Sequence, residues 1–249
     1  MQDSQVNDGR DRYDRRAFCK TAGVATAVAT AVGIVEATLG TVLAHADLTK
    51  EQRDKMTPDE IIQQMKAGNE RFRAGKPQHR DLMREAKATA KAQYPAAIVF
   101  SCIDSRAPAE LILDFGIGDI FSGRVAGNVA DEDVLGSMEF ACKVAGSKVV
   151  LVMGHTACGA IKGAIDEVQL GNLTALLSKI RPAVEATPYT GERSAKNYGF
   201  VDAVARKNVS MTIATIREKS TVLRELESSG SIKIAGSMYN LETGIVEFL

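Results

Sequence analysis

Two short, continuous runs of apolar residues constrain the fold of this 249-residue chain more than any other feature. Ala96–Ser101 and Lys148–Gly154 consist mainly of aliphatic and β-branched residues, without the polar alternation of a strand that has one wet face. Such runs are typical of strands buried on both faces of a parallel sheet. We predict two further strands around Ile120–Phe121 and Ser231–Tyr239, and an antiparallel edge strand at Ile245–Phe248.

Segments with helical character lie between these strands, at about 109–114, 133–145, 157–167, 173–184 and 196–219. Strands that alternate with helices predict an α/β fold: a mostly parallel central sheet of four to five strands flanked by helices. The chain therefore reads as one catalytic domain over residues 47–249.

A helical arm is expected before the first strand, over residues 57–92. Thr57 is a helix N-cap, followed by Pro58 at the first helical position and Glu60 at the third. Helices are predicted to end near residue 75 and to run over about 82–92, whereas residues 47–55 read as a polar linker. We expect the arm to pack against another surface.

The first 46 residues differ from the rest and have the layout of an export signal. Arg15 and Arg16 precede a run rich in Ala, Val, Thr and Gly, and the small-x-small pattern at 44–46 predicts cleavage. The paired arginines resemble a twin-arginine signal, which predicts a periplasmic protein. An uncleaved anchor is the alternative, but Glu36 and the many small residues make a poor spanning helix. We expect no stable membrane association after cleavage.

Charge and cysteine content argue against two classes of protein: nucleic-acid-binding proteins and proteins held together by disulfides. Lys+Arg and Asp+Glu both number 31, and the chain has no Trp, so a nucleic-acid partner is not expected. Signal cleavage would leave Cys102, Cys142 and Cys158, an odd number that argues against a full disulfide framework. Cys142 lies among apolar residues and is predicted to be a packed core thiol. His79 is predicted to lie on a surface loop.

Potential metal ligands follow two of the predicted strands. Cys102 comes directly after the first, and His155 and Cys158 come directly after the third. Sites in α/β sheets form beyond the carboxyl ends of the strands, and two thiolates with an imidazole favour zinc. We predict one Zn²⁺ per subunit bound by these three residues. A structural site usually has four Cys or His ligands, so three ligands indicate an open catalytic position.

Two polar residues beside the first cysteine are predicted to be catalytic. Zinc with an open position lowers the pKa of its water to about 7, although two thiolates should weaken this effect. Asp104 could accept a hydrogen bond from the zinc-bound hydroxide and orient it. Arg106 could keep Asp104 ionised and in place.

Three motifs together resemble the beta-class carbonic anhydrases: Cys102–Arg106, Arg124–Asn128 and His155–Gly159. The resemblance implies that zinc-bound hydroxide attacks carbon dioxide, reversibly giving bicarbonate and a proton. It also implies a homodimer or a dimer-based homo-oligomer, with the active site at the interface and the helical arm around the partner.

The resemblance further implies three substrate-binding residues. Gln93 stands nine residues before the first cysteine ligand, Phe121 would line the apolar carbon dioxide pocket, and Gly159 would offer a backbone N–H to the substrate oxygen. The presence of Gln93 favours a resting site in which water, rather than Asp104, completes the zinc. The family often has Asn where Val125 stands, which leaves a carbon disulfide or carbonyl sulfide hydrolase as one alternative. A non-catalytic zinc-containing structural module is the other.

Overall fold

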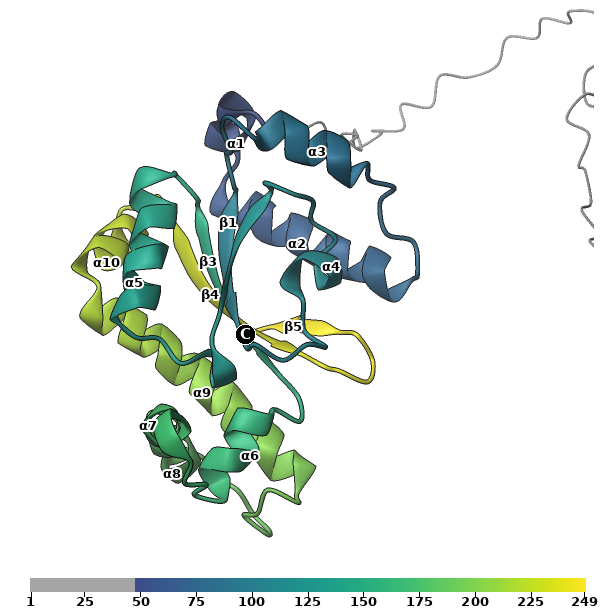
Figure 1. Cartoon of the computed structure of the whole chain (residues 1–249). Helices are drawn as coiled ribbons and strands as arrows, with labels where there is room; N and C mark the ends of the chain where they lie inside the picture. Colours follow the sequence, from purple (N-terminus) through teal and green to yellow (C-terminus); the bar gives the residue numbers. More distant parts are fainter. Residues whose placement is uncertain (1–47) are drawn as a thin grey trace, which may run out of the picture. The chain divides into compact units, whose positions relative to one another are not determined.

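The computed structural model describes residues 48–249. The predicted export signal and its cleavage site lie outside these residues. The described part of the chain is built around one sheet with strand order β2-β1-β3-β4-β5 (Figure 1). The strands are β1 Ala97–Ser101, β2 Ile120–Arg124, β3 Val149–His155, β4 Lys233–Tyr239 and β5 Val246–Phe248. Neighbouring strands are parallel except for β5, which runs antiparallel to β4, so the predicted fold class is confirmed.

The two central strands are buried on both faces, as their apolar runs predict. Every residue of β1 and β3 is buried. Side chains alternate across a strand, so Ile98 and Phe100 enter one core cluster while Ala97 and Val99 enter the other. Helices α5, α9 and α10 lie on one side of the sheet and α2 and α4 on the other (Figure 1). The helices are α1 Lys50–Lys55, α2 Pro58–Arg73, α3 Leu82–Thr89, α4 Ala109–Ile112, α5 Glu132–Glu139, α6 Gly159–Ile165, α7 Gly171–Ser178, α8 Arg181–Ala186, α9 Tyr198–Lys219 and α10 Thr221–Ser228, with a 3₁₀ turn η1 Ala126–Asn128 and a π-helical turn η2 Phe140–Val144.

The N-terminal helices differ from the prediction in two respects. The expected linker contains helix α1, because Thr49 and Gln52 form a capping box. Helix α2 begins after its N-cap Thr57 as predicted, but its fully buried Ile61 and Met65 pack against the chain's own sheet. Helix α2 is therefore packed on the sheet of its own chain and does not extend away from it as an arm.

The remaining differences between the predicted and the observed structure concern where helices begin and end. The stretch predicted as one helix over 173–184 is two, α7 and α8, because Pro182 cannot donate the hydrogen bond that a continuous helix needs. Helix α10 was not predicted, although Ser220 caps it through a hydrogen bond from the Leu223 N–H. Helix α6 begins after Cys158 rather than at Ala157, whose φ of 55° is left-handed. No helix among residues 48–249 is long and apolar enough to cross a membrane.

Candidate metal centre

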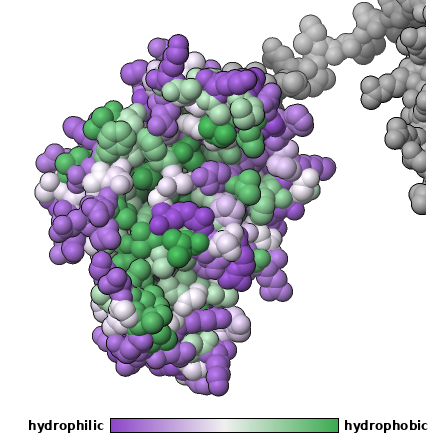
Figure 2. Space-filling view, viewed as in Figure 1, coloured by the Kyte–Doolittle hydropathy of each residue, from purple (hydrophilic) through white to green (hydrophobic). Residues whose placement is uncertain are grey.

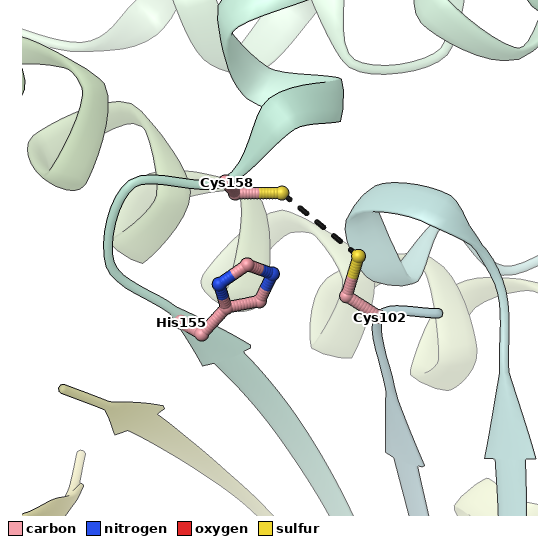
Figure 3. Close-up of side chains that lie close together, drawn as sticks. All are labelled: Cys102, His155 and Cys158. Carbon is pink, nitrogen blue, oxygen red and sulfur yellow. Dashed lines mark hydrogen bonds between the residues drawn. The ribbon is translucent and has the colours of Figure 1, made fainter. Parts of the chain in front are cut away.

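The three predicted metal ligands meet where β1 and β3 end. Cys102 follows β1 directly, His155 is the last residue of β3, and Cys158 is the N-cap of α6. All three are buried, and their candidate ligand atoms lie within 4.8 Å of one another (Figure 3). The parallel register of β1 and β3 brings the two loops level. The structure thus brings together the whole predicted ligand set.

The geometry and the donor atoms fit zinc. The sulfur atoms of Cys102 and Cys158 are 4.0 Å apart, and two thiolates at 2.3 Å on a tetrahedral metal would be about 3.8 Å apart. The His155 Nδ1 atom lies 2.9 Å from the carbonyl oxygen of Thr156. A proton on Nδ1 leaves the Nε2 lone pair facing the cysteines, and buried Nε2 has no hydrogen-bond partner among the described residues.

The cysteine pair already favours one thiolate. The pKa of Cys102 is lowered because Cys158 donates to its sulfur, with a further hydrogen bond from the Gly127 N–H. The same contact raises the pKa of Cys158, the donor of the pair. Metal binding requires both thiols to be deprotonated, so it would release the proton that they share.

Asp104 and Arg106 form a close ion pair beside the ligands. Arg106 Nη2 lies 2.7 Å from Asp104 Oδ2, and Arg106 Nε donates to Oδ1 at 2.9 Å. These hydrogen bonds hold the pKa of Asp104 well below its usual range. Asp104 Oδ2 is also 3.9 Å from His155 Nε2. The predicted dyad is therefore formed, and its carboxylate faces the metal cluster.

Two residues that support the first ligand loop were not predicted. The Nε of Arg124 donates to the Cys102 carbonyl at 2.9 Å, and its Nη2 donates to the Asp104 carbonyl. Gly127 has a φ of 65°, and its N–H donates to the Cys102 sulfur at 3.3 Å. Both belong to the Arg124–Asn128 motif, where an Arg and a Gly just after a buried strand were the available signal.

Of the three predicted substrate-binding residues, one adjoins a metal ligand and two lie away from the metal ligands. Gly159 follows Cys158 directly and is the first residue of α6. Gln93 is exposed and precedes β1, at the opposite end of that strand from Cys102. Phe121 pairs in register with Ile98, four residues before Cys102, which is about 13 Å along a strand. The structure does not bring Gln93 or Phe121 to the metal ligands of their own chain.

The other two candidate ligands lie outside the centre, as predicted. Cys142 is buried, and burial raises the pKa of its thiol to about 12. His79 is exposed in the loop before α3. Neither belongs to the metal cluster found among the described residues.

Comparison with known proteins identifies close relatives. The family model described as carbonic anhydrase matches residues 97–246. Carbonic anhydrase 2 of Mycobacterium tuberculosis is 37% identical over 186 residues, which cover 72% of this chain and 87% of the relative. A β-carbonic anhydrase of Aspergillus fumigatus superposes with a TM-score of 0.58 at 26% identity, over 67% of this chain and 81% of that one. Tetrameric β-carbonic anhydrases of Sordaria macrospora share the fold, with a TM-score of 0.58 at 23% identity over 67% of this chain and 90% of the matched chain.

Proposed function

The chain belongs to the β-class carbonic anhydrases, a family of zinc enzymes that hydrate carbon dioxide, and we propose which of its residues carry that reaction. Reversible hydration of carbon dioxide to bicarbonate and a proton is the activity that the family match and the fold support. A sulfur-substrate hydrolase and a non-catalytic module are not favoured by these matches. The buried cluster of Cys102, His155 and Cys158 carries the proposal, because its three ligands fit a catalytic zinc.

We assign the zinc to these three side chains and the control of the attacking water to Asp104. Zinc held there supplies the Lewis acidity that makes a water molecule acidic enough to act as a nucleophile near neutral pH. Asp104 is kept ionised by Arg106, so its carboxylate can only accept a hydrogen bond. It would accept a hydrogen bond from the attacking water and thereby orient an oxygen lone pair toward the carbon of the substrate. We assign to the backbone N–H of Gly159, the first residue of α6, the role of donor to a substrate oxygen.

Asp104→Ala tests this assignment. We expect the variant to retain one zinc per chain, measured by elemental analysis, and to lose most of its carbon dioxide hydration in a stopped-flow assay. Asp133→Ala is the matched control, because Asp133 is an exposed acid at the start of α5. Full hydration activity in a zinc-loaded Asp104→Ala enzyme would show that the dyad is assigned wrongly. Turnover of carbon disulfide or carbonyl sulfide faster than carbon dioxide would identify the other reaction.

We further propose that the enzyme works as a homodimer or a dimer-based oligomer. Gln93 precedes β1 and Phe121 lies near the start of β2, both away from the metal cluster of their own chain, so we assign them to a neighbouring chain's site. Several large apolar side chains are exposed, including Leu111 at 65%, Phe140 at 54% and Val144 at 71%. Apolar side chains gather in a band down the middle of one face (Figure 2). Contact with a second copy would cover such a band.

Complementation between two defective chains tests the shared site. Asp104→Ala removes the dyad and keeps Gln93, whereas Gln93→Ala does the reverse. In a mixed dimer, the Gln93→Ala chain would receive Gln93 from its partner. We expect a co-refolded mixture to hydrate carbon dioxide faster than the sum of the two separate variants. A strictly additive rate would place Gln93 outside the active site of either chain.

Export rests on the sequence alone and remains part of the proposal. The paired Arg15 and Arg16 and the small-residue run that follows support a twin-arginine signal and a periplasmic enzyme. Replacing both arginines with lysine should block export, measured by cell fractionation. Unchanged export would reject the twin-arginine assignment.

A further inference from the structure

The turn between the second and third metal ligands contains a strained residue. Ala157 lies between His155 and Cys158 and has a φ of 55°. Left-handed backbone is unfavourable for a residue with a Cβ atom, and it persists only where surrounding contacts impose it. Here it reverses the chain after β3, so that two ligands three residues apart face one centre.

A side chain from a distant helix supplies such a contact. Asp202, on α9, accepts a hydrogen bond from the Ala157 N–H through Oδ1 at 2.8 Å. The neighbouring Thr156 is fixed from β4 and the loop after it, because its N–H donates to the Tyr239 carbonyl and its hydroxyl accepts from the Leu241 N–H. The turn is therefore held from two sides, and Asp202 is the contact at its strained position.

Helix α9 also contacts the loop that supports the first ligand. The Asn208 side chain donates to the Gly127 carbonyl at 2.8 Å. The N–H of Gly127 in turn donates to the Cys102 sulfur. Asp202 and Asn208 are six residues apart on α9, so one helix reaches both of the loops that converge on the metal centre.

We propose that Asp202 is a positioning residue of the metal centre: its hydrogen bond to Ala157 keeps the left-handed turn that aligns His155 with Cys158. Such supporting partners of metal ligands typically change metal affinity by about 10–100-fold when they are removed. The inference rests on the proposed zinc assignment, but it concerns the affinity and geometry of metal binding rather than hydration.

The test measures metal binding in purified variants of the enzyme. We expect Asp202→Ala to raise the zinc dissociation constant at least about tenfold in competition with a chromophoric chelator. Asp202→Asn should change it less than about threefold, because its amide oxygen can still accept from the Ala157 N–H. Adding Ala157→Gly to Asp202→Ala should recover several-fold of the lost affinity, since glycine adopts the left-handed turn without strain. The absorption spectrum of cobalt-substituted protein reports the ligand geometry independently.

Two control variants separate positioning from general stability. Ser210→Ala alters an exposed residue of the same helix and should leave zinc affinity unchanged. Glu167 is left-handed at the end of α6, with a φ of 55°, so Glu167→Gly relieves similar strain outside the turn. It should not rescue Asp202→Ala. If Asp202→Ala does not fold, Asp202→Ser takes its place, because the shorter side chain cannot span the same contact.

Wild-type zinc affinity and an unchanged cobalt spectrum in Asp202→Ala would overturn the proposal. Equal rescue by Ala157→Gly and Glu167→Gly would overturn it as well. Failure of the wild-type enzyme to hydrate carbon dioxide would refute the proposed function and leave this result unaffected.

Discussion

Gly127→Ala tests how tightly the first ligand loop is packed. Gly127 has a φ of 65°, and a Cβ atom there would lie 2.6 Å from the Ile180 Cδ1 atom and 3.2 Å from the Ala160 Cβ atom. Ile180 is fully buried in the core cluster, so its side chain has little room to move away. Alanine at this position therefore faces backbone strain and overpacking together.

The two costs can be estimated separately. Left-handed backbone costs about 1–2 kcal/mol for a residue with a Cβ atom. Overpacking a close-packed core typically costs about 1–3 kcal/mol. Gly127→Ala should thus lower the free energy of unfolding by about 2–5 kcal/mol. Gly75, after α2, is the matched control, because its φ is 64° and a Cβ atom added there would have no described atom within 4 Å. Gly75→Ala should lose only the backbone contribution, about 1–2 kcal/mol.

Urea unfolding at one fixed protein and zinc concentration measures both variants on the same scale. The difference between them isolates the contact with Ile180. Zinc affinity provides a second measurement, because displacement of Gly127 weakens the N–H hydrogen bond to the Cys102 sulfur, whereas Gly75 makes no such bond to a ligand. Equal losses of stability in the two variants, with equal zinc affinity, would refute the argument from close packing.

Three single side chains give further expected outcomes. Burial raises the pKa of Cys142 to about 12, so iodoacetamide should not modify this thiol in the folded enzyme at about pH 8. Rapid labelling would contradict its burial. Cys142→Ala should keep one zinc per chain. The pKa of Asp104 is lowered by Arg106, so the ion pair's contribution to stability is present above the unfolded-state pKa of about 3.9 and is lost as pH falls through the lower folded-state pKa. The urea midpoint of wild type should therefore exceed that of Arg106→Gln by a constant margin above about pH 5 and by a shrinking one below about pH 4; a margin that grows in acid would have the wrong sign. Phe140→Glu should weaken the proposed assembly, and an unchanged mass in light scattering would place the interface elsewhere.

The fold was largely predictable because the buried strands have an unambiguous pattern. Double-sided burial allows only apolar residues at nearly every position of β1 and β3, and the sequence contains those runs. Helix α1 was missed because a six-residue helix has no room for an apolar stripe; its capping box was the only signal. The break between α7 and α8 at Pro182 was visible in the sequence but was outweighed by the apolar residues on both sides.

The metal centre was predictable for a topological reason, since its residues follow two neighbouring parallel strands. Its support was not predictable in the same way. Asp202 and Asn208 lie 45 and 81 residues from the backbone groups that they bind. Nothing in a local pattern distinguishes them from other polar residues on a long helix. The strain at Ala157 also leaves no trace in the sequence, because glycine or asparagine, the usual residues in left-handed backbone, is absent there.

The same topology explains why Gln93 and Phe121 are separated from the metal ligands. Gln93 is nine residues from Cys102 along the chain, and this short separation suggests proximity. The two residues are nevertheless far apart in space, because β1 lies between them and runs from one end of the sheet to the other. Phe121 lies near the same end of the sheet as Gln93, because it pairs in register with Ile98. One chain of a parallel sheet therefore cannot supply both its metal ligands and these two residues to a single site. If Gln93 and Phe121 contact substrate, a second chain must bring that end of its sheet to the first chain's metal centre, which makes assembly a requirement for the complete pocket.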